Sequence, residues 1–185
     1  VSQVNPEALK EHRGIIANPN CSTMQLAPLL QALHVEAGLR RVVVATYQAV
    51  SGAGAESVND LIQQRAAVVA GEKPVSTIYP HPVILSPTPA IDVFLEDGST
   101  KEEEKVVRES RKILSLPELR ISATAVRIPV EVSHSEAVHV ELDRPISPVR
   151  ARTVFAQTAG VFVQDDPATH TYPLASEAAG SDGIF

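Results

Sequence analysis

The chain has 185 residues, of which 44% are apolar and 21% are charged, a composition typical of a globular domain rather than a disordered or fibrous chain. Its formal net charge is −6 and its Lys and Arg residues are scattered, which argues against a nucleic-acid partner. The single cysteine cannot form an intrachain disulfide, and no apolar run approaches the roughly 18 residues of a membrane helix. We therefore expect one cytoplasmic domain without a membrane span.

The first part of the chain predicts two helices around a buried strand. Apolar residues recur at helical spacing from Met24 to Ala37, where Gly38 is a plausible C-cap, although Pro28 should kink this helix or delay its regular part. Residues 41–47 are short and β-branched, which is typical of a buried strand. A second helical period runs from Ala55 to Val69.

The rest of the chain predicts a more irregular succession of elements. Residues 73–89 carry five prolines, too many for regular structure, so we expect an excursion over the surface or across a partner. After the turn at Asp97-Gly98, Thr100 and Glu103 form a capping box for a helix to about Leu114. Further elements are expected as strands at Leu119–Pro129, Ser135–Leu142 and Val161–Gln164, and a short helix opening at Ser147-Pro148. This order predicts an α+β fold, a mixed sheet covered by helices on one face.

Cys21 is a candidate nucleophile because of the residues around it. It lies in Asn18-Pro19-Asn20-Cys21-Ser22-Thr23, a string of capping residues just before a helical pattern. The positive end of the helix dipole and unpaired N–H groups favour a thiolate there and could hold an oxyanion. A small buried cysteine beside ordinary capping residues is the alternative, and the spacing alone leaves both open.

Four further residues are candidates whose pattern alone also allows a structural role. Arg127 and His134 flank a predicted strand corner that could place a cation and a base at one site. Glu102 and Lys105 share a helix face, which usually means a solvated salt bridge. No histidine has metal-ligand spacing with a second carboxylate or thiol, so we predict no metal. Residues 52–57 supply two of the three glycines of a dinucleotide-binding turn, which is weak evidence by itself.

Three separated motifs resemble those of the aspartate-semialdehyde dehydrogenase family. Residues 16–23 resemble its nucleophile motif, and residues 45–54 resemble its substrate and nicotinamide loop. Residues 127–129 together with 134–136 resemble its arginine and base motif. The order of the three is the family's order. The resemblance implies a fold similar to the C-terminal catalytic domain of glyceraldehyde-3-phosphate-dehydrogenase-like enzymes.

The resemblance also implies roles for individual residues. Cys21 would attack the acyl group, His134 would be the general base and acid, and Gln48 would orient the reacting group. The substrate would be bound by Asn20, Glu102, Lys105 and Arg127, with Lys105 on the phosphate. The nicotinamide end of the cofactor would face Ser51, Gly52, Ala53, Gly54 and Ala55.

The implied reaction is the NADPH-dependent reductive dephosphorylation of L-aspartyl-4-phosphate to L-aspartate 4-semialdehyde, a step toward diaminopimelate and lysine, threonine and methionine. The implied cofactor is NADP, and the implied partners are aspartyl phosphate, inorganic phosphate and a second copy of the chain. Thiolate attack would release phosphate and leave a thioester for hydride to reduce.

The chain also departs from the family pattern. Residues 83–92 differ from the usual approach to the Ile-Asp pair. Residues 1–185 would form the catalytic and dimerisation domain, whereas the N-terminal NADP-binding Rossmann domain and a C-terminal helix are missing, so we expect no turnover from this chain alone. Two alternatives stay open, namely a non-catalytic dimerisation module and a related acyl-phosphate or acyl-CoA reductase. The pair Arg127 and Glu102 argues against the second.

Overall fold

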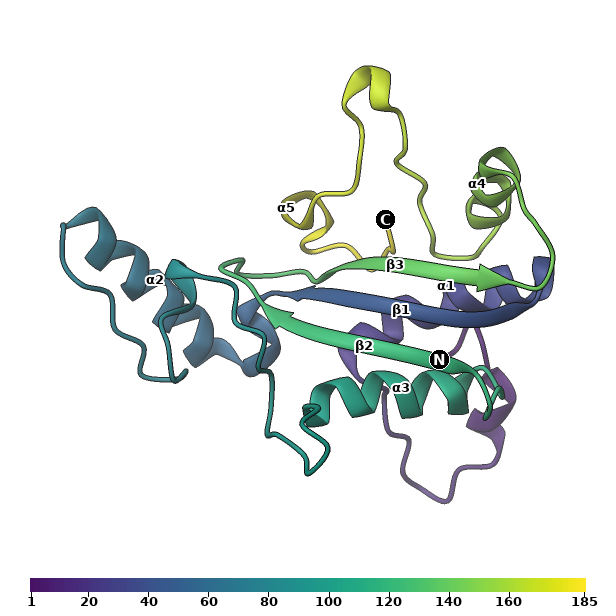
Figure 1. The fold of residues 1–185 in the computed structure, drawn as a ribbon, viewed down its shortest axis with the longest axis horizontal. Helices are drawn as coiled ribbons and strands as arrows, with labels where there is room; N and C mark the ends of the chain where they lie inside the picture. The colour runs from purple at the N-terminus through teal and green to yellow at the C-terminus, as the bar shows by residue number, and fades with distance from the viewer.

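The computed structural model describes residues 1–185 and is built around a three-stranded mixed sheet (Figure 1). The central strand β1 (Leu39–Gln48) pairs in parallel with β2 (Arg120–Arg127) and antiparallel with β3 (Ser135–Leu142). Its burial alternates along the strand, as expected when one face of a sheet is packed and the other is open. The register places Gln48 beside Arg127 at the end of the sheet where the candidate residues gather.

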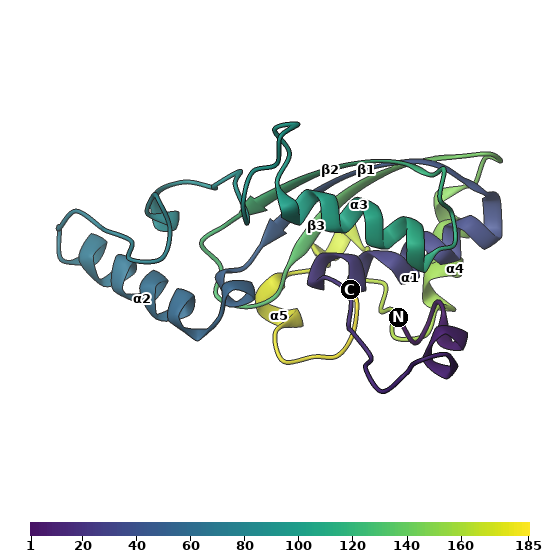
Figure 2. The same cartoon turned by 90° about the horizontal axis from the view of Figure 1, so that it is seen from below.

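The main helices lie on one face of this sheet, as Figure 2 shows. They are α1 (Cys21–Ala37), α3 (Lys101–Ile113) and α4 (Pro148–Ala156); α5 (Ala175–Ala178) is a single turn near the C-terminus. The other face stays open, and Val43 and Tyr47 expose 36% and 42% of their surface there. The predicted α+β sheet with a one-sided helical cover is confirmed. None of the helices combines the length and the apolar character needed to span a membrane.

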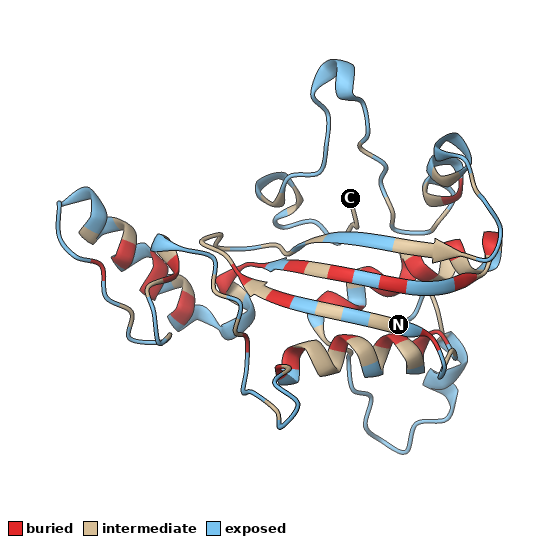
Figure 3. Cartoon of the chain, in the orientation of Figure 1, coloured by how far each residue is buried: buried red, intermediate tan, exposed pale blue.

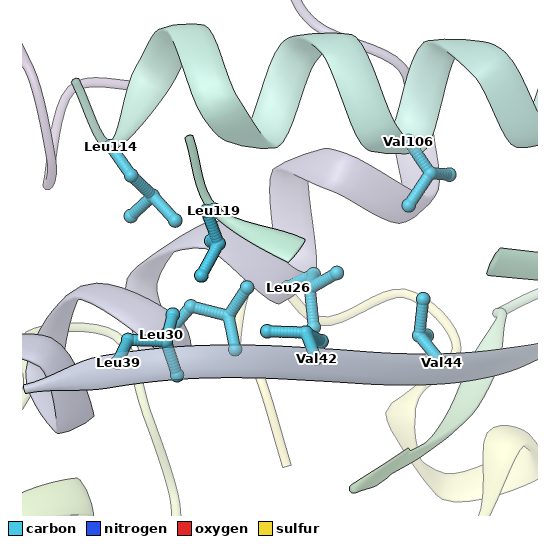
Figure 4. Packing of buried hydrophobic residues seen from close by; sticks show 8 residues of the cluster. All are labelled: Leu26, Leu30, Leu39, Val42, Val44, Val106, Leu114 and Leu119. Atoms are coloured by element: carbon cyan, nitrogen blue, oxygen red, sulfur yellow. The ribbon is translucent and has the colours of Figure 1, made fainter. Parts of the chain in front are cut away.

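The core lies between β1 and the two helices α1 and α3. Buried residues lie along these elements in the ribbon of Figure 3. Eight aliphatic side chains form the core, and Figure 4 shows them packed together: Leu26, Leu30, Leu39, Val42, Val44, Val106, Leu114 and Leu119. Burying each of them contributes roughly 1.5–3 kcal/mol relative to exposure. This packing fixes the N-terminal end of α1 against α3, and so fixes where Cys21 lies.

Helix α2 (Ala55–Val69) projects away from the sheet and carries the proline-rich segment on its side (Figure 1). Asp60 accepts hydrogen bonds from the backbone and side chain of Thr77 and from Ser76, and Gln64 accepts one from the Ile84 backbone. Val50, Leu61 and Val83 form a small hydrophobic cluster between α2 and the proline-rich segment. The segment contains only one short 3-10 turn, Val83–Leu85, as the proline content predicts.

Two sequence-based predictions need correction. Helix α1 begins at Cys21, three residues before the expected start, and it runs through Pro28. The predicted strand at Val161–Gln164 is wrong. A single bridge joins Val161 to Ile184, and the chain then turns at Asp166, so no neighbouring strand satisfies the remaining backbone groups. The other short 3-10 turns are Pro6–Lys10, Val50–Ala53 and Pro167–Thr169.

Candidate active site

Cys21 is the first residue of α1, and Asn20 caps the helix in front of it. The Asn20 side chain accepts hydrogen bonds from the backbone N–H groups of Ser22 at 3.0 Å and Thr23 at 3.3 Å. This is the arrangement that stabilises a helix start. Cys21 is exposed as a residue, although neighbouring side chains surround part of its thiol.

His134 meets Cys21 from the connection between β2 and β3. Its Nε2 lies 3.2 Å from Cys21 Sγ, and its Nδ1 accepts a hydrogen bond from the Ala49 backbone N–H at 3.0 Å. Because Nδ1 is an acceptor, the proton of the neutral ring is on Nε2 and points at the sulfur. Ser133, with φ of +76°, makes the turn that presents the ring.

The charge balance at the Cys21–His134 pair favours the neutral forms. Burial raises the pKa of the Cys21 thiol, and the negative charge of Glu102 raises it further. The backbone N–H groups at the helix start lower that pKa, as predicted, but burial and the charge of Glu102 outweigh them. Burial and the charge of Arg127 lower the pKa of His134.

Glu102 joins three of the predicted residues in one buried network. Its Oε1 accepts hydrogen bonds from Asn20 Nδ2 at 2.8 Å and from Gln48 Nε2 at 2.9 Å. Burial by itself would raise the pKa of Glu102, but the hydrogen bonds it accepts, including that from Lys105, lower it. Glu102 is therefore a fixed anion with 6% of its surface exposed, so the alternative of a solvated salt bridge does not hold at this position.

Gln48 has only one orientation of its amide that satisfies its neighbours. The Glu102 carboxylate can only accept, so Nε2 faces it, and Oε1 then accepts from the buried Thr46 hydroxyl at 3.0 Å. The Nε2 atom is also 4.0 Å from Cys21 Sγ. The side chain thus presents an N–H donor beside the thiol.

Arg127 is a buried cation with hydrogen-bonding capacity left over. It is 5% exposed and donates from Nη1 to the Ala49 carbonyl at 2.6 Å, whereas its buried Nε has no partner. Buried N–H groups without a partner are rare in proteins.

Lys105 lies one turn beyond Glu102 on α3. Its Nζ pairs with Asp92 at 2.9 Å and with Glu102 at 3.3 Å, and it keeps 34% of its side chain exposed. The hydrogen bond to Asp92 is the first cause of its raised pKa. Asp92 was not predicted as a site residue, although its left-handed backbone, with φ of +69°, marks it as a special position.

The predicted cofactor loop lies directly beside the pair. Ser51–Ala53 belong to a 3-10 turn, Gly54 has φ of +99°, and Ala55 begins α2. A Cβ atom at Gly52 would stand 3.2 Å from His134 Nε2 and 3.3 Å from Arg127 Nη1, so a side chain there would push on both of these groups.

Two carboxylates near the site have no role in the sequence-based predictions, although Glu136 lies within the motif at residues 134–136. Glu109 accepts the Asn20 backbone N–H at 2.6 Å; its position seven residues after Glu102, on the same face of α3, is the signal that could have found it. Glu136 accepts from Gln25 Nε2 at 2.9 Å, and burial raises its pKa to about 7. No cluster of three His, Cys, Asp or Glu side chains has the geometry of a metal site.

The mixed sheet, its one-sided helical cover and the cysteine at a helix start define an α+β domain of the type found at the C-terminus of glyceraldehyde-3-phosphate-dehydrogenase-like enzymes. Residues 26–185 match the family described as semialdehyde dehydrogenase, dimerisation domain. The chain belongs to this family.

Named relatives agree with this assignment. The chain is 47% identical to aspartate-semialdehyde dehydrogenase of Aquifex aeolicus and 40% identical to that of Bacillus subtilis, in both cases over all of its own length. It covers 55% and 56% of those two proteins, so it spans about half their length. The crystal structure of aspartate semialdehyde dehydrogenase II complexed with ASA from Vibrio cholerae aligns with a TM-score of 0.90 at 37% identity, over 98% of this chain and 54% of that one.

Proposed function

We propose that this chain is the catalytic and dimerisation half of an NADP-dependent aspartate-semialdehyde dehydrogenase. The proposal depends chiefly on one contact, the 3.2 Å approach of His134 Nε2 to Cys21 Sγ between residues 113 positions apart. A thiol in contact with an imidazole, with an amide donor and a buried cation beside it, is suited to acyl transfer. The names of the relatives supply the substrate, and the reaction would serve amino-acid biosynthesis in the cytoplasm.

The substrate groups match the charges around the thiol. An aspartyl ammonium would meet the buried carboxylate of Glu102, and the α-carboxylate would meet the guanidinium of Arg127. The phosphate would meet Lys105, which is more exposed than either. Asn20 and Gln48 would hold the acyl end against Cys21. These pairings disfavour a reductase for a substrate without amino and carboxylate groups.

In the first half of the reaction, Cys21 Sγ attacks the acyl carbon of the acyl phosphate. The C–S bond forms, the bond to the phosphate oxygen breaks, and phosphate leaves with that electron pair, so a thioester remains on Cys21. The N–H groups of Gln48 and His134 face the position of the oxyanion. The thiol proton passes to His134 Nε2. This transfer requires the ring tautomer with its proton on Nδ1, so the ring must first release the Ala49 N–H. The Nε2–H group of the imidazolium then faces the oxyanion.

The glycine-rich turn at Ser51–Ala55 is suited to the nicotinamide end of NADPH, because the backbone of Gly52 lies against His134 and Arg127 without a side chain. When bound, NADPH supplies a hydride to the thioester carbon. Cys21 then leaves as a thiolate when the tetrahedral oxyanion collapses to the aldehyde. His134 holds its Nε2 proton at this oxyanion while the charge develops.

The second partner would be another copy of the chain. The family is that of a dimerisation domain, and the open sheet face carries exposed Val43 and Tyr47. We expect light scattering at micromolar concentration to give twice the chain mass. A monomeric mass would contradict the dimer.

The test of function joins the chain to the dinucleotide-binding half that its relatives have. We expect this longer protein to oxidise aspartate semialdehyde with NADP only when inorganic phosphate is present, and the 185-residue chain alone to give no turnover. Activity that does not depend on phosphate would contradict the acyl-phosphate chemistry. Dimerisation without any turnover in the longer protein would instead favour a non-catalytic module.

A further inference from the structure

Asn20 is held from two sides by the same helix. Glu102 accepts its side-chain N–H at 2.8 Å, and Glu109 accepts its backbone N–H at 2.6 Å. The two carboxylates are seven residues apart, two turns of α3, and so lie on one face of it. Only Glu102 belongs to the substrate-binding set proposed above.

The contact with Glu109 completes a cap that α1 lacks in its own sequence. In a capping box the third helical residue is Glu or Gln, and its side chain accepts the N–H of the capping residue. Helix α3 has this locally in Thr100 and Glu103. In α1 the third residue is Thr23, whose buried hydroxyl has no partner, and the N–H of Asn20 reaches Glu109, 89 residues away, instead.

We propose that Glu109 is a positioning residue, which supplies the missing carboxylate of this cap and thereby sets where Cys21 lies. Charge-assisted hydrogen bonds to a backbone N–H are short and strong. Cys21 follows Asn20 directly, so a shift of this turn changes the 3.2 Å approach of Sγ to His134. The effect on turnover rests on the proposed function; the hydrogen bond itself does not.

The kinetic experiment uses the protein joined to its dinucleotide-binding half. Glu109→Ala should lower kcat by roughly 10- to 100-fold, the loss expected when reacting groups are displaced by about 1 Å, and change KM for semialdehyde and phosphate by less than about threefold. Glu109→Gln, which can still accept the N–H, should recover kcat to within about fivefold. The control is Glu104→Ala, which removes only an exposed pair with Arg108 on the same helix and should leave kcat unchanged.

A spectroscopic measurement on the 185-residue chain tests the contact without turnover. The chain has four asparagines, Asn5, Asn18, Asn20 and Asn59, and only Asn20 follows a proline. Labelling the amide nitrogen of Asn with nitrogen-15 and the carbonyl of Pro with carbon-13 therefore identifies the NMR signal of the Asn20 backbone amide. Glu109→Ala should move this signal upfield and speed its exchange with solvent by roughly tenfold or more, whereas Glu104→Ala should not.

The two measurements separate the possible failures. If the chemical shift and exchange rate of the Asn20 amide are unchanged in Glu109→Ala, the proposal is overturned, whatever the value of kcat. A changed amide with unchanged kcat, or a kcat that Glu109→Gln does not recover, also overturns it, because the contact then only stabilises the fold. If the parent protein has no dehydrogenase activity, the proposed function fails, and the positioning of Cys21 fails with it even where the amide responds.

Discussion

The N-terminal ends of helices α1 and α3 are capped in different ways. At α3, Thr100 and Glu103 cap each other within one turn, and the hydrogen bonds are complete without the rest of the fold. At α1, Asn20 caps Ser22 and Thr23, but its own N–H groups are taken by two carboxylates of α3. The local cap makes a stable helix end. The shared cap ties the position of Cys21 to helix α3, which carries Glu102 and Glu109.

The largest expected effect comes from replacing the side chain that this shared cap presents. In the joined protein, Cys21→Ser should lower kcat by about a thousandfold or more, since a serine hydroxyl is a poorer nucleophile and its ester is harder to reduce. Phosphate-dependent oxidation of the semialdehyde measures it, with thermal melting as the fold control. Activity near that of the parent would remove Cys21 from its role.

The next effect tests whether α3 meets the substrate as well as the cap. Lys105→Ala should raise KM for phosphate about 10- to 150-fold, the loss of one charge-assisted hydrogen bond worth roughly 1.5–3 kcal/mol. A lysine that only pairs with Asp92 and Glu102 across the surface would contribute less than about 1 kcal/mol. An unchanged phosphate dependence would therefore leave Lys105 with its ion pairs alone.

The two caps can be compared directly by measuring how much the loss of each lowers the free energy of unfolding of the chain. Asn20→Ala should cost about 2–3 kcal/mol, because it removes a cap and also leaves the buried Glu102 short of a donor. Thr100→Ala, with a local partner only, should cost about 1 kcal/mol. Urea unfolding of both variants measures the difference, and equal losses would mean that the shared cap is no more tightly coupled than the local one.

The sequence predicts the features that depend on near neighbours better than those that depend on distant residues. The capping box at Thr100 and the strand Ser135–Leu142 depend on near neighbours and were predicted at the observed positions. The predicted start of α1 is three residues late, because apolar spacing begins at Met24 whereas the capping residue is Asn20. The strand predicted at Val161–Gln164 failed because a strand needs a partner that its own residues cannot supply.

In the candidate site, too, the local sequence indicates single residues but not the contacts between distant ones. The capping residues around Cys21 drew attention to it, but residue types alone could not say that His134, 113 positions away, would touch it. The resemblance to a family supplied that pairing, together with Gln48 and Arg127. It did not supply Glu109 or the Ala49 N–H that decides the protonation of the imidazole, because both act through backbone groups.

The last expected effect depends on pH and concerns the other side of α1, where Gln25 donates to Glu136 of β3. Burial raises the pKa of Glu136 to about 7 from an ordinary 4.5, so the folded chain holds this proton more tightly than the unfolded chain. A raised pKa contributes stability that is fully present below pH 4.5 and is lost as pH rises through about 7.

Glu136→Gln should abolish that loss and leave the variant more stable than the parent by roughly 1–3 kcal/mol above pH 7, with little difference at pH 4.5. Thermal or urea unfolding from pH 4.5 to 8 measures it. Glu141→Gln on the same strand is the matched control, because the hydrogen bond from Arg41 lowers the pKa of Glu141 and its titration falls below this window. A parent and a Glu136→Gln variant with parallel pH profiles would show that Glu136 ionises freely, and that α1 is anchored through carboxylates on the α3 side alone.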